Sequence, residues 1–284
     1  MNNQIAHKPS FSVAINTKQF QRAISNTLRD PDRVRRFTAS IVSAVSTNPD
    51  LQECDAGTIV SAALLGESLN LSPSPQLGQY YLVPFNSKNG MKKAQFQLGY
   101  KGYIQLAIRS GYYKKLNVMA IKEGELIKFD PLEETIEVML IEDEAVRETA
   151  ETTGYYAMFE YHNGFRKALY WTKAKMQAHA VKYSKGYAAR KGYTFWEKDF
   201  DGMAYKTMLR QLISKWGIMS IEMQDVIAKD MAVLHEDGTA EYIETQAEMI
   251  QQDEPEEWNM KNTDAEEFET PDSEQVTLSL DEIE

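Results

Sequence analysis

The sequence predicts an α+β fold in which an antiparallel β-sheet is backed by helices. Residues 17–70 carry apolar residues at helical spacing, and residues 172–234 return to that spacing. Between them, short runs rich in β-branched and aromatic residues are separated by turn signals, which indicates strands. Helices, then mostly strands, then helices is the order expected of an α+β domain.

The N-terminal region is predicted to form three helices after a flexible segment over residues 1–16. The first spans Thr17–Leu28 and repeats an apolar residue every fourth position. The second starts at Pro31, a residue that is tolerated in a first helical turn. The third begins after Asp55, a favourable N-cap, and ends before Pro73.

The strand-rich middle is predicted to begin and end with a hairpin, each built around an Asn-Gly turn. The first pairs Gln79–Phe85 with Lys93–Leu98, and the second pairs Gly154–Tyr161 with Phe165–Thr172. The segments between the hairpins are predicted to be one helix, Gly99–Ser110, and three strands, Leu116–Ile121, Leu126–Phe129 and Thr135–Leu140.

Helices are predicted again over Thr172–Ser184 and Trp196–Trp216, with a shorter one over about residues 221–234. Between the two long helices, Lys185–Tyr193 holds two glycines and three cations, which predicts a mobile clamp and not a core segment. An apolar stripe of the second long helix is expected to face the core: Phe200, Ala204, Leu209, Leu212, Ile213 and Trp216.

Charge divides the chain into a basic body and an acidic tail. Residues 236–284 hold eighteen acidic residues and one lysine, whereas residues 1–235 hold 30 basic and 24 acidic residues. The tail is too polar to bury much surface, so it is predicted to be mostly disordered, and residues 17–235 are predicted to be the working core. A charge asymmetry of this kind points to nucleic acid.

Features that would place the chain outside the cytosol are missing from the sequence. The segment Met1–Phe11 lacks the apolar core of a signal peptide, and no stretch approaches a membrane span in length and apolarity. Cys54 is the only cysteine, which excludes an internal disulfide and predicts a small buried thiol. The sequence therefore predicts a cytosolic protein.

The segment Lys173–Lys215, which we call the basic strip, is rich in cations and contains aromatic residues between them. Ten cations stand against three anions, and seven aromatic residues lie in the same window. Cations neutralise phosphates and rings stack on bases, so the strip suits single-stranded nucleic acid. Tyr187, Tyr193 and Phe195 are candidates for stacking, although burial is expected for Phe195. A solvated helix face beside an aromatic core is the alternative interpretation.

Motifs for covalent or nucleotide-driven chemistry are missing. A phosphate-binding P-loop needs Gly followed by Lys-Ser or Lys-Thr, and no glycine here has that context. The chain has no serine nucleophile elbow, and its four histidines are scattered without metal-ligand spacing. The acidic groups at 133–134, 142–144 and 197–201 are interpreted as solvated edges or helix-ordering groups. We predict no cofactor, no metal site and no catalytic residue, so the protein is not expected to be an enzyme.

Two runs carry a family resemblance. Residues 97–111, QLGYKGYIQLAIRSG, and residues 200–216, FDGMAYKTMLRQLISKW, are similar to the central motifs of the phage RecT family of single-strand annealing proteins. Residues 69–73, LNLSP, and residues 79–85, QYYLVPF, also match. The matching segments keep the order of the family over about residues 20–235.

The resemblance implies an ATP-independent recombinase that binds single-stranded DNA and anneals complementary strands in phage recombination. It also implies a core similar to that of other single-strand annealing proteins, and assembly into homo-oligomeric rings or helical filaments. The partners it implies are single-stranded and annealed duplex DNA, a companion exonuclease and the host single-strand-binding protein. The implied location is the cytoplasm of the bacterial host.

The resemblance assigns phosphate contacts to Lys101 and Arg109 in the first motif, and to Lys206 and Arg210 in the second. The last two residues stand at i, i+4 and are expected on an exposed helix face, where their mutual repulsion would be relieved by phosphates. Charge and ring character add further candidates for DNA binding: Lys114, Lys115, Lys182, Lys185, Tyr187, Arg190, Lys191 and Lys198.

Two other functions compete with annealing. A passive binder of single-stranded DNA or RNA would need the same cations and rings. A metal-dependent nuclease of the same pathway would need its carboxylates gathered around Mg²⁺. Annealing of complementary strands without nucleotide would distinguish an annealing protein from a passive binder. Loss of DNA length with Mg²⁺ would support the nuclease.

Overall fold

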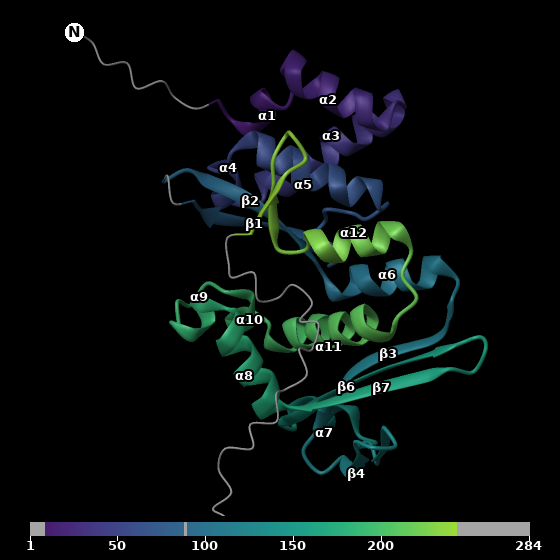
Figure 1. The fold of residues 1–284 in the computed structure, drawn as a ribbon. Helices are drawn as coiled ribbons and strands as arrows, with labels where there is room; N and C mark the ends of the chain where they lie inside the picture. Colours follow the sequence, from purple (N-terminus) through teal and green to yellow (C-terminus); the bar gives the residue numbers. More distant parts are fainter. Residues whose placement is uncertain (1–8, 88–89, 243–284) are drawn as a thin grey trace, which may run out of the picture. The chain divides into compact units, whose positions relative to one another are not determined.

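Antiparallel sheets packed against helices make up the computed structural model, which describes residues 9–87 and 90–242 (Figure 1). This architecture confirms the predicted α+β class. The first eight residues of the predicted flexible N-terminus and residues 243–284 of the predicted disordered tail lie outside the described residues.

The N-terminal region is helical, as predicted. Side chains cap its two longest helices: Asp30 accepts a hydrogen bond from the backbone N–H of Asp32, and Asp55 accepts one from that of Thr58. Two single-turn helices were not predicted from the sequence. The helices are α1 (Phe11–Ala14), α2 (Lys18–Leu28), α3 (Pro31–Ser46), α4 (Pro49–Gln52) and α5 (Ala56–Ser68).

The first sheet joins two pairs of strands that lie far apart in the sequence. Its order is β1-β2-β8-β9, and the first hairpin has the predicted pairing. Strands β2 and β8 are linked by the register pair Gln95↔Val233, and the backbone N–H of Met231 donates to the carbonyl of Phe96 at 2.9 Å. The strands are β1 (Tyr80–Asn86), β2 (Lys92–Leu98), β8 (Ala232–Leu234) and β9 (Ala240–Tyr242).

The helix predicted over about residues 221–234 ends earlier than expected, at Lys229. Helix α12 (Ile221–Lys229) stops where Met231 adopts a left-handed backbone conformation, with φ 68°. The chain then adds β8 to the sheet, because pairing with β2 satisfies backbone groups that a longer helix would have to bond internally. The β8–β9 hairpin also extends past the predicted boundary at residue 235.

A second sheet, β3-β6-β7, contains the second predicted hairpin. Helix α6 precedes it, and β4, β5 and α7 form an excursion between β3 and β6 that we call the acidic lobe, residues 123–151. The elements are α6 (Tyr100–Ser110), β3 (Tyr113–Lys122), β4 (Leu126–Asp130), β5 (Thr135–Val138), α7 (Glu144–Thr149), β6 (Thr152–Tyr161) and β7 (Arg166–Thr172).

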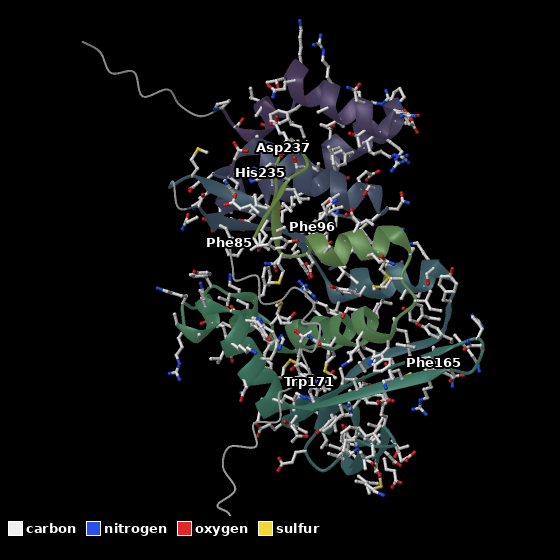
Figure 2. All side chains as sticks on the ribbon, in the orientation of Figure 1. Phe85, Phe96, Phe165, Trp171, His235 and Asp237 are labelled. Carbon is white, nitrogen blue, oxygen red and sulfur yellow. The ribbon has the colours of Figure 1, made fainter. Side chains whose placement is uncertain are left out.

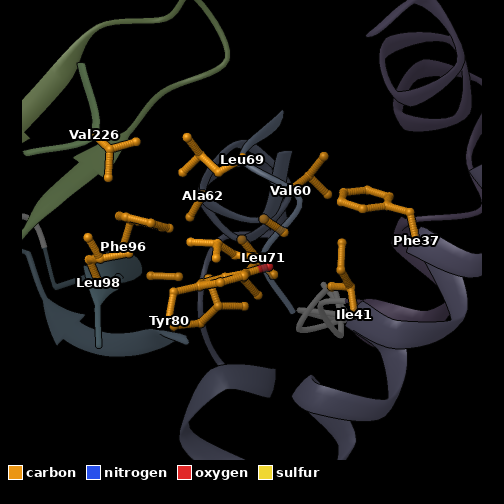
Figure 3. Packing of buried hydrophobic residues seen from close by; sticks show 14 of the residues in the cluster. Phe37, Ile41, Val60, Ala62, Leu69, Leu71, Tyr80, Phe96, Leu98 and Val226 are labelled. Carbon is orange, nitrogen blue, oxygen red and sulfur yellow. The ribbon is translucent and has the colours of Figure 1, made fainter. Parts of the chain in front are cut away.

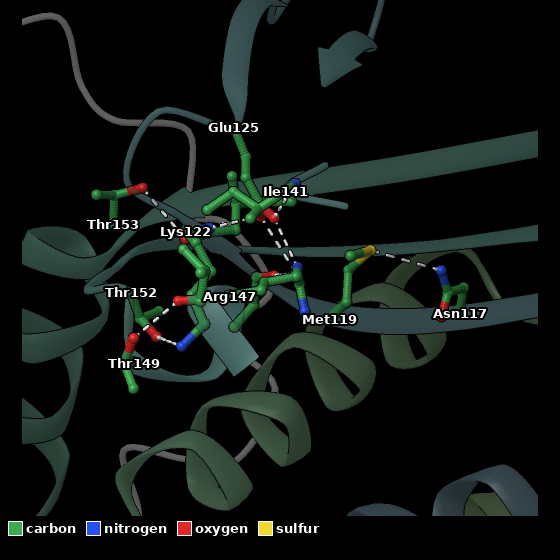
Figure 4. A network of polar contacts seen from close by, with 12 residues as sticks. Asn117, Met119, Lys122, Glu125, Ile141, Arg147, Thr149, Thr152 and Thr153 are labelled. Carbon is green, nitrogen blue, oxygen red and sulfur yellow. Dashed lines mark hydrogen bonds and ion pairs between the residues drawn. The ribbon is translucent and has the colours of Figure 1, made fainter. Parts of the chain in front are cut away.

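A buried carboxylate attaches the acidic lobe to β3. Glu125 is fully buried and accepts hydrogen bonds from Arg147 Nε at 2.6 Å and from the backbone N–H groups of Lys122 and Ile141 (Figure 4). Burial acts to raise the pKa of Glu125, but these donors outweigh it and hold the pKa below its ordinary value. Arg147 also donates to the carbonyl of Ala120, so β3, β4 and α7 share one network.

The predicted long helix over Trp196–Trp216 is divided in two. Asp199 has φ −148° and ψ 76°, so it ends one helix and caps the next by accepting from the backbone N–H of Gly202. The segment predicted as a clamp contains a single-turn helix. These elements are α8 (Lys173–Tyr183), α9 (Lys185–Ala188), α10 (Phe195–Lys198) and α11 (Phe200–Trp216).

Helix α11 lies between two hydrophobic cores. Leu209 and Ile213 pack into the core formed by the N-terminal helices and the first sheet, part of which Figure 3 shows. Met208 and Leu212 pack into the core formed by β3, β6 and α8. Four residues of the expected apolar stripe are therefore buried, whereas Phe200 is half-buried and Trp216 is 44% exposed. Cys54 is buried, as predicted.

Candidate nucleic-acid interface

Five of the predicted DNA-binding cations are exposed on one connected segment, α8 to α10: Lys182, Lys185, Arg190, Lys191 and Lys198. The loop that carries two of them is held by hydrogen bonds. Lys191 N–H donates to the carbonyl of Gly186, and Glu197 accepts from the backbone N–H groups of Gly192 and Thr194. The loop therefore presents its cations on an ordered turn.

The three acidic residues of the basic strip have structural contacts. Glu197 completes a capping box with Thr194, and Asp199 caps α11. Asp201 accepts a hydrogen bond from Tyr155 Oη at 2.6 Å. Glu197 and Asp199 thus order helix starts, as expected for helix-ordering groups, whereas Asp201 anchors the strip to β6, a contact that was not predicted.

Half-buried rings connect this segment to β1 and α6. The rings of Tyr81 and Phe195 lie 5.4 Å apart, so β1 contacts α10. A Cβ placed on Gly78 would lie 3.0 Å from Tyr81 Oη and 3.4 Å from Lys101 Cδ. Tyr81 therefore contacts Phe195, and both Tyr81 and Lys101 border Gly78. Burial was expected for Phe195, and the residue is half-buried.

Helix α6 continues the line of cations. Lys101, Gln105 and Arg109 are exposed at i, i+4 and i+8, which places them on one stripe of the helix. Arg109 Nη1 lies 3.5 Å from the carbonyl oxygen of Asn70, in the loop after α5. We call the combined surface the basic track: the five cations of α8–α10, the Tyr81–Phe195 pair, Lys101 and Arg109.

The remaining predicted contacts are placed differently. Lys114 and Lys115 are exposed, but both contact Glu160, at 2.6 and 3.5 Å, because a bulge in β3 turns them toward one neighbour. Tyr187 is half-buried, with its ring 6.1 Å from that of Trp196 and 6.2 Å from that of Phe200. A role of Tyr187 in stacking on bases remains a prediction.

The expectation that Lys206 and Arg210 lie on an exposed helix face is wrong. They are 5% and 9% exposed, and both contact the carboxylate of Asp230, which is itself 2% exposed. Asp230 also accepts from the backbone N–H of Leu98 and from Tyr103 Oη. Since α11 is buried on two sides, its cations need a buried counter-charge and not a phosphate.

The role of Asp230 was not predicted from the sequence. One signal was available: Asp230 and Lys229 are the only charged residues in the run over 226–234. An acidic residue in such a run must be paired if the run is buried.

His179 lies in an aromatic cluster and not in a metal site. Its ring lies 5.4 Å from that of Trp171 and 4.4 Å from that of Tyr183, and Figure 2 shows Trp171 near the end of β7. Burial lowers the pKa of His179 to about 4, with smaller contributions from Arg210, Lys182 and Lys175. The imidazole is therefore neutral at physiological pH.

The lowered pKa of His179 predicts that the folded protein loses stability in acid. Because the folded-state pKa lies below the unfolded value, the unfolded chain binds more protons and stability falls as pH drops from about 6.5 to 4. The loss due to His179 should be on the order of 2–3 kcal/mol. Urea unfolding at several pH values measures it. His179→Phe should show a smaller loss over the same interval, and an unchanged pH dependence would contradict the assignment.

Comparison with known proteins decides the family. The model of the RecT family matches residues 35–249. The chain belongs to the RecT family. It is 32% identical over 206 residues to Protein RecT of Escherichia coli (strain K12), covering 69% of this chain and 72% of that protein. It is 45% identical over 212 residues to the uncharacterized protein YqaK of Bacillus subtilis (strain 168), covering 75% of this chain and 67% of that protein.

Membership of the RecT family confirms the resemblance carried by the sequence motifs and identifies a single-strand annealing protein that acts in recombination. Binding of single-stranded DNA follows from the same family. Among the described residues, every helix is too short or too polar to cross a membrane.

Proposed function

We propose that this protein anneals complementary DNA strands without ATP, in phage homologous recombination. The observation that carries the proposal is the basic track, in which exposed cations of α6 and α8–α10 are joined through the half-buried Tyr81–Phe195 pair. A surface that combines exposed cations with aromatic rings suits a single strand of any sequence.

The mechanism requires binding and no covalent step. Lys185, Arg190, Lys191 and Lys198 would neutralise phosphates along one part of the strand, and Lys101 and Arg109 would do so along the next. Phosphate contacts position the backbone and carry no sequence information, so the Watson–Crick edges of the bases stay available to a second strand. Lys114 and Lys115 would add contacts only after leaving Glu160.

Annealing of two long complementary strands without nucleotide tests the proposal. The protein should accelerate duplex formation well above the spontaneous rate, and added ATP should leave the rate unchanged. Binding without acceleration would favour the passive binder. Shortening of the strands in the presence of Mg²⁺ would favour the nuclease.

We also propose that copies of the chain assemble into rings or filaments through the acidic lobe. Residues 123–151 hold eleven acidic and two basic residues, in contrast to the basic body. The lobe exposes Ile127, Leu132, Met139 and Val146, with Leu132 90% exposed. An exposed apolar surface surrounded by acidic residues complements a basic surface of a second copy. Because the two contacting surfaces differ, such a head-to-tail contact generates rings or filaments.

Substitutions in the acidic lobe are expected to disrupt the assembly. Changing Ile127 and Met139 to Asp should convert large assemblies into small species, because apolar contacts would be replaced by charges that repel the acidic surroundings. Sedimentation velocity and electron microscopy measure the change. Ile218→Asp, which alters an exposed apolar residue between α11 and α12, is the matched control. Unchanged assembly of the lobe variant would place the interface elsewhere.

The acidic tail, 236–284, is proposed as the contact for a companion exonuclease and for the host single-strand-binding protein in the bacterial cytoplasm. Eighteen acidic residues in this segment support an electrostatic partner contact. A truncation that tests this should end after Tyr242, because β9 pairs with β8 and belongs to the first sheet.

A further inference from the structure

Residues of α3, the end of α5 and the loop leading to β1 line a pocket. Its volume is about 630 Å³, within the range of small-molecule and cofactor sites. The lining residues come from the first ten residues of α3, from Glu67 at the end of α5, and from the LNLSP motif together with Gln79.

The backbone of the loop is fixed in the shape that forms the pocket. Asn70 adopts a left-handed conformation, with φ 51°, and ends α5. The backbone N–H of Leu71 then donates to the carbonyl of Gly66, and that of Ser72 donates to Gln79 Oε1 at 2.7 Å. These hydrogen bonds hold the loop that lines one side of the pocket.

The charge balance of the pocket favours an anion. Glu67 is neutralised by Arg33, whose Nη2 and Nε lie 2.9 and 3.1 Å from Glu67 Oε1. Arg36 is exposed at the rim and makes no ion pair within the described residues. Arg109, the last cation of the basic track, reaches the rim through Asn70. Two cations are thus left to hold a phosphate that arrives along the track.

The rest of the lining suits a nucleobase. Phe37 and Leu71 give an apolar floor that belongs to the first hydrophobic core (Figure 3). Ser40, Asn70 and Ser72 supply hydroxyl and amide groups, which can both donate and accept hydrogen bonds. An apolar floor, a few polar groups and a cationic rim together match one nucleotide of a nucleic-acid strand.

We propose that this pocket receives one nucleotide of the bound single strand, turned out of the base stack, with its phosphates held between Arg36 and Arg109. The inference rests on the proposed function and deepens it. The strand would follow the basic track along α6 and be pinned where the track ends. A pinned nucleotide limits sliding while the remaining bases are tested against a second strand.

The test compares Arg36→Ala and Ser40→Trp with the full-length parent chain. Binding to a short labelled oligothymidylate and to an abasic strand of the same length is measured as a function of salt. The parent should prefer the strand that carries bases. Arg36→Ala should lose about fivefold in affinity at moderate salt, with a salt slope smaller by about 0.7, as expected for one phosphate contact. Ser40→Trp, which fills the pocket, should remove the preference for bases.

Arg35→Ala is the matched control, since Arg35 is the adjacent residue on α3, pairs with Asp32 and does not line the pocket. A parent chain that fails to bind either strand would overturn the proposed function itself. A parent that binds normally, with Arg36→Ala indistinguishable from Arg35→Ala, would overturn the pocket alone.

Two further outcomes remain decisive. Tighter DNA binding by Arg36→Ala would assign the pocket to an acidic peptide that competes with DNA, and would also overturn the inference. If Ser40→Trp fails to fold, Arg36→Glu takes its place, because charge reversal at this exposed position should weaken binding further than Arg36→Ala while the unfolding midpoint stays unchanged.

Discussion

Replacing Asp230 by alanine is expected to lower the free energy of unfolding by about 3–5 kcal/mol, because two buried cations lose their counter-charge. Lys206 Nζ lies 3.1 Å and Arg210 Nη1 3.4 Å from Asp230 Oδ2. The same carboxylate holds the backbone of Leu98 and the hydroxyl of Tyr103, so the loss is shared by α11, α6 and β2. Urea unfolding followed by circular dichroism measures the change.

Asp225→Ala is the control for this variant, since Asp225 pairs with Lys229 on the exposed face of α12 and should contribute less than about 1 kcal/mol. Equal effects of the two variants would show that the Asp230 network is not essential for stability. Replacing Lys206, Arg210 and Asp230 together by Met, Met and Leu should recover much of the loss, because no uncompensated charge remains.

The second large effect is expected on DNA binding. Changing Lys185, Arg190, Lys191 and Lys198 to Ala should weaken binding to a short single strand by on the order of 10²-fold at physiological salt. The slope of log affinity against log salt should fall by about 3, since each phosphate contact with a single strand contributes about 0.7. Fluorescence anisotropy over a salt series measures both quantities, and thermal unfolding confirms that the variant is folded.

The control for this variant removes three exposed cations from α2 and the turn that follows it, Lys18, Arg22 and Arg29. A short oligonucleotide is used so that contacts between neighbouring subunits do not enter. A similar loss in the control would mean that the net charge of the body determines affinity. A normal affinity of the four-residue variant would move the interface away from α8–α10.

The secondary structure was largely predictable because hydrophobic spacing and turn chemistry act locally. Asn-Gly turns predicted both hairpins, and Asp55 predicted the start of α5 from its capping side chain alone. The failures are non-local. Residues 231–234 have no helix-breaking signal in sequence, and they become a strand because the edge of β2 is available for pairing.

The candidate site was predictable only where exposure follows from sequence. Lys185 and Lys191 stand beside glycines in a polar segment, and they are exposed as expected. A count of charges does not distinguish Lys206 and Arg210 from these exposed cations. They are nevertheless buried, because α11 contacts a hydrophobic core on each side. The pocket could not be found either, since Arg36 and Gln79 are brought together only by the packing of α3 against the loop after α5.

The contact between β2 and β8 has a consequence for how the chain folds. Gln95 Nε2 donates to the carbonyl of Met231, 136 residues away in sequence. During synthesis, β2 therefore leaves the ribosome long before the strand that covers its edge, and an open strand edge pairs readily with other chains. Closure over so long a loop is slow. We expect refolding from denaturant to be rate-limited by arrival of the β8–β9 hairpin, and nascent chains that lack it to aggregate.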